Sequence, residues 1–243
     1  MTRFLVTLLT GLVLAVSPGA AQSQTEVALE LVLLADASGS IDNAEIQFQR
    51  QGYAEAITDP EVIGAITSTP HGRIAVTYVE WGQADSQHVV VDWTVVDGPD
   101  SAAAFAEALM IPRRAAFGRN AIGAALLFGR DLILNNDIEG FRKVIDISAD
   151  SANNWNGPGI AFGRNEAVAA GIVVNGLAVL CRHCSGRPVT YDLEQRFQER
   201  IIGGPGAFVI TADGPDTFAD AVRRKLVLEI AGPGATDRTV AEK

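Results

Sequence analysis

The chain has 243 residues, of which 48% are hydrophobic and 20% charged, and its formal net charge is −10. This composition supports a substantial hydrophobic core and argues against disorder. An acidic chain repels nucleic acid and anionic lipid surfaces, because it adds to the phosphate charge instead of neutralising it. We therefore expect neither as a partner, and the charge would suit cations instead.

The first 21 residues (MTRFLVTLLTGLVLAVSPGAA) predict a secretory signal peptide. Arg3 supplies the positive charge, an apolar segment follows, and residues 19–21 (GAA) have the small side chains of a cleavage site. The apolar run is short for a spanning helix, which needs about 20 residues. We expect cleavage after Ala21, a mature chain of residues 22–243 without a stable membrane span, and a periplasmic or secreted location.

Strand and helix patterns alternate along the mature chain. The apolar run at residues 27–35 predicts a buried central strand. Asp42 and Glu45 have the spacing of a capping box for a helix over residues 44–57. A short helix at residues 60–66 and two strands at residues 73–81 and 87–96 come next. Only a few residues separate these two strands, so they should form an antiparallel hairpin.

The second half continues the alternation, beginning with helices at residues 100–110 and 120–134, the latter with Asn120 as its N-cap. The later elements are a strand at 143–148, a helix at 163–170, a strand at 172–180, a helix at 191–201, a strand at 207–211 and a helix at 217–230. The order predicts an α/β fold with a doubly wound, mostly parallel six-stranded sheet and one antiparallel edge strand. Ligands of such sheets bind outside the carboxyl ends of the strands.

A D-x-S-x-S motif ends the first predicted strand, where Asp36, Ser38 and Ser40 offer a carboxylate and two hydroxyls. Hard divalent cations prefer such oxygen ligands, and we expect the intervening Gly39 to let the chain turn so that the hydroxyls converge. Because hydroxyls are neutral, a cation held there keeps positive charge and can accept a carboxylate from a partner. The alternative is an ordinary turn that caps the following helix.

Asp150 and Asn120 follow and precede later elements at the same predicted edge of the sheet. Together with Asp36, Ser38 and Ser40, they resemble the metal-ion-dependent adhesion site of von Willebrand factor A (vWA) domains. In that family two serines and a threonine contact the metal directly, and two aspartates act largely through water. The resemblance implies a divalent cation, Mg²⁺ first with Mn²⁺ or Ca²⁺ as alternatives, and a protein partner that presents a carboxylate.

The vWA resemblance covers essentially the whole mature chain, with a core at about residues 27–231. It extends to a bacterial family of exported vWA-like proteins of unknown function. The stretches that carry this second resemblance are residues 72–81, 145–148, 152–154 and 202–208. One position departs from the vWA pattern, because Asn120 stands in place of the threonine. Its amide oxygen can bind a hard cation, but the side chain can instead only cap a helix.

Three functional interpretations therefore stay open: a metal-dependent protein-binding module, a metal-free structural or assembly module, and a periplasmic hydrolase. A serine hydrolase would need G-x-S-x-G around its nucleophile, and the loop around Ser38 lacks the first glycine. The base would have to be His71, His88 or His183, none of which has an evident carboxylate partner. We expect a protein that is not an enzyme.

Other polar groups flank the predicted site. Arg113, Arg114 and Arg119 could attract an acidic partner, or simply belong to a solvated loop. Residues 153–156 (NNWN) could contribute specificity, or only turn chemistry. The C-x-x-C pair, Cys181 and Cys184, most simply forms a disulfide in an oxidising compartment, with a redox pair, free thiols or metal binding as alternatives. 

Overall fold

The computed structural model describes residues 24–180 and 190–232. Its strands are β1 (Thr25–Asp36), β2 (Ile74–Trp81), β3 (Gln87–Val96), β4 (Ile138–Ala149), β5 (Val173–Val179) and β6 (Val209–Ala212). Its helices are α1 (Asn43–Thr58), α2 (Pro60–Thr67), α3 (Pro99–Met110), α4 (Ile122–Leu134), α5 (Ile160–Ala169), α6 (Leu193–Arg200) and α7 (Pro215–Ala231). The strands form one six-stranded sheet in the order β3-β2-β1-β4-β5-β6. All neighbours are parallel except β3, which pairs antiparallel with β2 at one edge. The predicted α/β architecture is confirmed.

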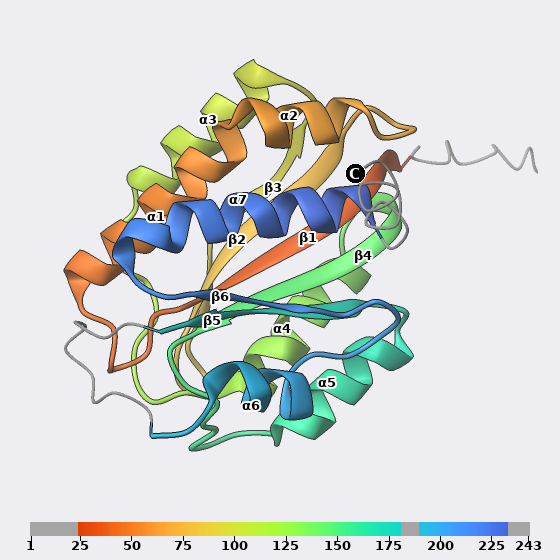
Figure 1. Ribbon diagram of the computed structural model, residues 1–243. Coiled ribbons are helices and arrows are strands. Elements are labelled where there is room, and N and C mark those ends of the chain that lie inside the picture. Colours follow the sequence, from red (N-terminus) through yellow and green to blue (C-terminus); the bar gives the residue numbers. More distant parts are fainter. Residues whose placement is uncertain (1–23, 181–189, 233–243) are drawn as a thin grey trace, which may run out of the picture.

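Helices cover both faces of the sheet. Figure 1 shows α1, α2, α3 and α7 on one face and α4, α5 and α6 on the other. Successive side chains of β1 alternate between the two layers: Leu31 and Leu33 belong to the core beneath the first group, and Val32 and Leu34 to the core beneath the second. A strand with both faces buried is apolar at most positions, and in β1 the buried Glu30 is the one interruption between residues 27 and 35. This double burial explains why β1 reads as a continuous apolar run.

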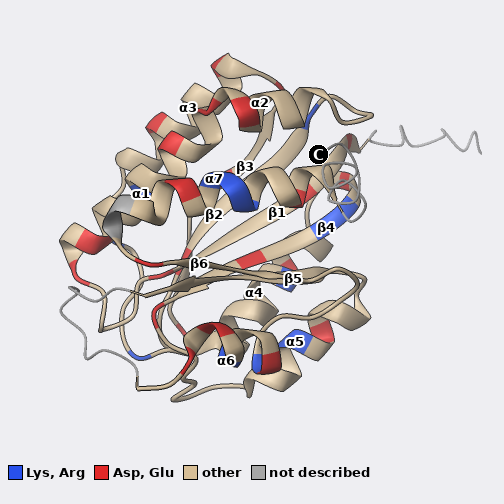
Figure 2. Ribbon diagram, in the orientation of Figure 1, with Lys and Arg blue, Asp and Glu red and all other residues tan. Residues whose placement is uncertain are grey.

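Figure 2 shows both acidic and basic segments on the helices of the two layers. At the start of α1 the predicted capping box is present. Asp42 Oδ1 accepts from the backbone N–H groups of Ala44 and Glu45, and the Glu45 carboxylate accepts from Asp42 N at 2.6 Å. No helix within residues 24–180 and 190–232 is long and apolar enough to cross a bilayer.

Some element boundaries differ from the prediction. Strand β4 begins at Ile138, five residues before the predicted start, because its first residues pair with the equally long β1 from Thr25 onward. Helix α5 begins at Ile160 instead of residue 163. Two predictions, the signal peptide and the Cys181–Cys184 disulfide, fall outside the described residues.

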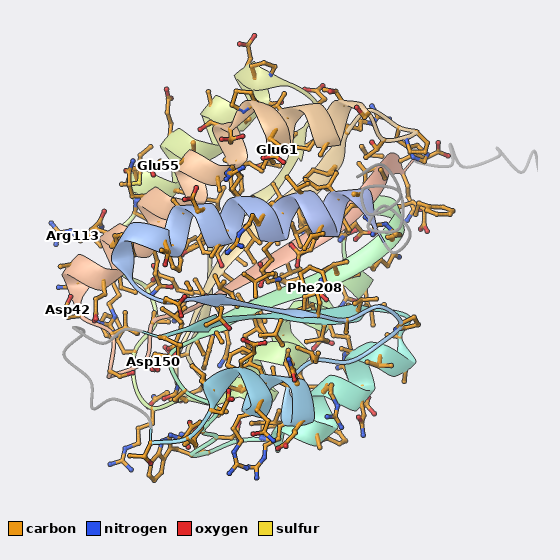
Figure 3. All side chains as sticks on the ribbon, in the orientation of Figure 1. Asp42, Glu55, Glu61, Arg113, Asp150 and Phe208 are labelled. Carbon is orange, nitrogen blue, oxygen red and sulfur yellow. The ribbon has the colours of Figure 1, made fainter. Side chains whose placement is uncertain are left out.

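The order of the strands changes direction next to β1. The chain passes from β1 to β2 on one side and later returns to β4 on the other side. Ala35 of β1 pairs with Ser148 of β4, so the loops after these two strands leave the same edge of the sheet side by side. Figure 3 shows Asp42, Arg113 and Asp150 gathered at this end of the molecule. The fold thus provides the ligand-binding edge that a doubly wound sheet is expected to have.

Candidate metal site

The D-x-S-x-S loop folds back on itself immediately after β1. Ser38 N donates to Asp36 Oδ1 at 2.7 Å, and the hydroxyl oxygens of Ser38 and Ser40 lie 3.3 Å apart. Asp36 and Ser38 are buried, and Ser40 is half-buried. The loop therefore presents two adjacent neutral oxygens beside a buried carboxylate, as its sequence predicted.

Two glycines face each other across this loop. Gly39 N donates to the carbonyl oxygen of Gly118 at 2.7 Å. The left-handed conformation belongs to Gly118, with φ of 91°, and not to Gly39. A Cβ at Gly118 would also lie 2.4 Å from Gln83 Oε1. The expectation that Gly39 provides the sharp turn was therefore wrong, because the residue that needs the conformational freedom of glycine is Gly118, in the opposing loop.

Asn120 reaches this loop, but it does not cap α4. Its Nδ2 donates to Asp36 Oδ2 at 3.1 Å, whereas the N-cap of α4 is Ala121, without a side-chain hydrogen bond. The predicted capping role was wrong. A hydrogen bond from the amide to an ionised carboxylate is stronger than one between two neutral groups, which favours the contact with Asp36. The structure thus places Asn120 against Asp36, with its amide nitrogen facing the carboxylate.

Asp150 approaches from the loop after β4. It is half-buried, and its Oδ1 is a buried atom that has no hydrogen-bond partner within the described residues. Burial raises the pKa of the Asp150 carboxyl, and a hydrogen bond from Ser40 partly offsets that rise. An unpartnered buried carboxylate oxygen is energetically costly. A bound cation would remove that cost.

The two aspartates also disfavour each other. The pKa of Asp36 is raised from 3.8 to about 7, chiefly by burial and then by the charge of Asp150, while hydrogen bonds from Ser38 lower it. Two buried like charges are costly unless a cation lies between or beside them. Two carboxylates, two hydroxyls and an amide oxygen match the oxygen ligands that a hard divalent cation prefers. The residues present therefore fit such an ion.

A first arginine holds the Asn120 loop to the body of the fold. Arg50 of α1 and Glu80 of β2 are fully buried, and Arg50 Nη2 lies 2.5 Å from Glu80 Oε1. Arg50 also donates to the carbonyl of Pro112, while Glu80 Oε2 accepts from Ala115 N at 2.7 Å. This buried pair thereby fixes the segment that leads to Asn120. Breaking such a pair leaves an uncompensated buried charge, so its geometry is strongly constrained.

A second arginine holds the D-x-S-x-S loop from beneath. Arg114 donates to the carbonyl oxygens of Ala37, Ser38 and Ile41, at 2.9 Å for Ser38 and 2.7 Å for Ile41. It also donates to Ala116 O at 2.9 Å. Because the guanidinium is occupied by backbone carbonyls, Arg114 does not act as a free loop charge. The sequence could not distinguish the role of Arg114 from that of Arg113. Only the tertiary structure shows that the Arg114 guanidinium binds these carbonyls.

The polar loop at residues 153–156 packs against the start of α4. Asn154 Oδ1 accepts from Gly123 N at 3.0 Å, and Trp155 N donates to Asn120 O at 2.8 Å. The loop therefore lies directly beside the candidate site. The hydroxyl of Ser38, the nucleophile position of a hydrolase, lies against Ser40, and no histidine among the described residues is hydrogen-bonded to it.

Comparison with known proteins identifies the family and the fold. A family model described as "Protein of unknown function (DUF1194)" matches residues 26–234. No curated protein matches the chain in sequence. Among solved structures, the chain is similar to the von Willebrand factor type A protein from Catenulispora acidiphila, with a TM-score of 0.55 and 17% identity over 85% of this chain and 43% of that one.

Two further structures share the fold. One is the pilus adhesin SpaC from Lactobacillus rhamnosus GG in its open conformation, with a TM-score of 0.60 and 14% identity over 86% of this chain and 31% of that one. The other is proximal thread matrix protein 1 from the mussel byssus, "with zinc occupied MIDAS motif", with a TM-score of 0.59 and 16% identity over 86% of this chain and 49% of that one. This chain thus spans a third to a half of these proteins, and the vWA-like fold is shown.

Proposed function

We propose that this chain, which belongs to the DUF1194 family, is a protein-binding module that captures a partner through a divalent cation. The direct ligands in the proposal are Ser38, Ser40 and Asn120, and Asp36 and Asp150 act mainly through water. Mg²⁺ is the expected ion, with Mn²⁺ or Ca²⁺ as alternatives. The predicted signal peptide would send the module to the periplasm or beyond.

One observation carries the proposal: two buried or half-buried carboxylates meet beside two hydroxyls, and Asp150 Oδ1 has no partner within the described residues. Desolvation and mutual repulsion raise the pKa of Asp36 to about 7. A divalent cation would relieve both effects at once, because its charge attracts both carboxylates and a water bound to it can donate to the Asp150 oxygen. The zinc-occupied motif of proximal thread matrix protein 1 supports a cation at the corresponding place in this fold.

The partner follows from the charge of the ligands. The proposed direct ligands are all neutral, so the cation would retain most of its positive charge towards solvent. A carboxylate from another protein is the oxygen ligand best suited to complete such a shell. The pilus adhesin SpaC shows that this fold occurs in an adhesive protein, which supports a binding role for the present chain.

Calorimetric titration of the chelator-treated protein with Mg²⁺, Mn²⁺ and Ca²⁺ tests the cation. Saturable binding at one site is expected, and Ser38→Ala should weaken it at least about tenfold, the equivalent of ~1.4 kcal/mol. Ser68→Ala is the matched control, because Ser68 is exposed at the C-cap of α2. Equal binding by Ser38→Ala and Ser68→Ala would refute the proposed ligands.

The second candidate is a metal-free assembly module, and one contact favours it. The Asn120 amide nitrogen already donates to Asp36 Oδ2, which partly satisfies that carboxylate without a metal. A degenerate site would show no heat with any of the three cations and no rise in melting temperature. That result would favour a module that binds its partner through the protein surface alone.

A further inference from the structure

Two aromatic side chains stand exposed beside the candidate metal site. Phe117 and Trp155 are 56% and 61% exposed. The guanidinium of Arg119 lies 4.9 Å from the centre of the Trp155 ring, and that of Arg114 lies 4.9 Å from the Phe117 ring. Cation–π contacts of this kind hold aromatic rings in defined orientations. We call Phe117, Arg119 and Trp155 the aromatic rim.

Backbone contacts fix the Trp155 side of the rim. Trp155 N donates to Asn120 O at 2.8 Å, and Asn154 forms an antiparallel bridge with Ala121. The Asn154 side chain donates to Pro158 O at 3.1 Å and accepts from Gly123 N at 3.0 Å. The exposed indole is therefore carried by a hydrogen-bonded loop. Its exposure is a property of the folded structure and not of a loose segment.

The Phe117 side is fixed in the same way. Phe117 N donates to Ser86 Oγ at 3.0 Å, and Phe117 O accepts from Gln83 N at 2.9 Å. A Cβ at Gly82 would lie 2.2 Å from Phe117 O, so the two loops touch backbone to backbone. Folding gains little from an exposed aromatic ring, because most of its surface stays in water. Rigid exposed aromatics of this kind are typical of binding surfaces.

The rim and the metal site form one surface. Arg119 precedes Asn120 in the chain, and Trp155 is hydrogen-bonded to the Asn120 backbone. Arg119 is exposed and stacks on the Trp155 ring, and within residues 24–180 and 190–232 it has no hydrogen bond or ion pair. A free guanidinium next to a cation site, on a chain of net charge −10, favours a negatively charged partner segment there.

We infer, on the basis of the proposed function, that the aromatic rim binds the side chains next to the carboxylate that binds the cation. The partner is a protein segment in which that acidic residue is flanked by an aromatic or large aliphatic side chain and by a second acidic residue. The apolar side chain packs on Trp155 and Phe117, and the second carboxylate pairs with Arg119. Tryptophan and arginine are the residues that most often dominate protein interfaces.

A phage-displayed peptide library with one fixed aspartate between randomised positions tests the inference. Selection is carried out on the full protein in Mn²⁺, and bound phage are released with chelator. We expect enrichment of aromatic or aliphatic residues and of a second acidic residue near the fixed aspartate. Trp155→Ala should remove the apolar preference and weaken the selected peptide at least about tenfold. Arg119→Ala should remove the acidic preference.

Phe141→Ala is the matched control, because Phe141 is exposed at the start of β4, at the opposite end of the sheet. Calorimetry with Mn²⁺ alone should give the same affinity for Trp155→Ala as for the wild type. Selected peptides without apolar preference, or a Trp155→Ala variant that behaves like Phe141→Ala, would overturn the inference. Bound Mn²⁺ without any chelator-released phage would also overturn it, whereas absence of Mn²⁺ binding would overturn the proposed function itself.

Discussion

Two pairs of acidic side chains in this fold are removed from water and repel each other, but only one pair has a cationic side chain beside it within the described residues. Asp36 and Asp150 lie at the carboxyl ends of β1 and β4, whereas Asp146 of β4 and Glu229 of α7 lie in the interior. The pKa values of both Asp36 and Asp146 are raised to about 7, chiefly by burial. In each pair the charge of the neighbouring carboxylate contributes to that rise.

The interior pair has a cation of its own. Lys225 Nζ lies 2.9 Å from Asp146 Oδ1 and 2.5 Å from Glu229 Oε1, and all three side chains are buried. Asp36 and Asp150 have no ammonium or guanidinium partner within the described residues. The comparison teaches that this chain neutralises buried carboxylates where only stability is at stake. At the edge of the sheet it leaves the pair open, which is how a cation site is built.

Removing the built-in cation should have the largest effect. Lys225→Met leaves Asp146 and Glu229 buried without a positive partner, so the free energy of unfolding should fall by about 3–5 kcal/mol. Urea denaturation at neutral pH measures this change. Arg130→Gln is the control: Arg130 pairs with Asp131 and Glu166 at the surface, and its loss should cost at most about 1 kcal/mol. Equal losses in both variants would show that Lys225 does not neutralise the interior pair.

The pH dependence of stability, compared between the wild type and Asp146→Asn, should reveal the raised pKa of Asp146. Folded Asp146 keeps its proton up to about pH 7, whereas the unfolded chain releases it near 3.8. The folded state therefore binds more protons in this window, and the free energy of unfolding should decrease as the pH rises through it. Asp146→Asn should reduce that slope by at most about 1.4 kcal/mol per pH unit. An unchanged slope in urea titrations would contradict the raised pKa.

The effect of Asp150→Asn on stability should change sign when the cation is present. Without cation, the variant loses a repulsive neighbour of Asp36 and should be more stable by on the order of 1 kcal/mol. With Mg²⁺ at about a hundred times its dissociation constant, the wild type should gain about 2.7 kcal/mol and the variant far less. Thermal and urea unfolding in chelator and in Mg²⁺ measure both. Asp85→Asn, at an exposed position, should respond like the wild type.

Asn120→Thr should have the smallest effect and the opposite sign. Threonine cannot donate an amide N–H to Asp36, and it restores the hydroxyl that the vWA resemblance implies at this position. We expect Mg²⁺ to bind about fivefold more tightly, the equivalent of ~1 kcal/mol. Asn120→Ala, which removes the oxygen altogether, should weaken binding. Calorimetry that ranks alanine above threonine would exclude position 120 as a ligand.

The sequence was sufficient for most of the fold. The run at residues 27–35 predicted a central strand because both of its faces are buried, and the Asp42–Glu45 spacing predicted the capping box of α1. Boundaries were less accurate where tertiary pairing decided them. The first residues of β4 carry no strong strand pattern, and their structure depends on pairing with β1.

The sequence predicted which candidate residues would lie at one edge of the sheet, but it could not predict their contacts. Asp36 and Asp150 were expected at one edge because parallel strands end together, and their electrostatic coupling agrees with that placement. Asn120 was expected to cap α4, but its side chain donates to Asp36 instead. A local sequence pattern could not show this contact, because the two residues are 84 positions apart. The inward turn of Arg114 was likewise invisible, because adjacent arginines look alike in sequence.

The location of the cation tests the central claim most directly. Crystals of the full protein soaked in Mn²⁺ would show it by anomalous scattering. The account predicts one peak bounded by Ser38, Ser40 and Asn120, with Asp36 and Asp150 behind it and Lys225 far from any peak. No peak at this edge of the sheet, or a peak held by other residues alone, would contradict it.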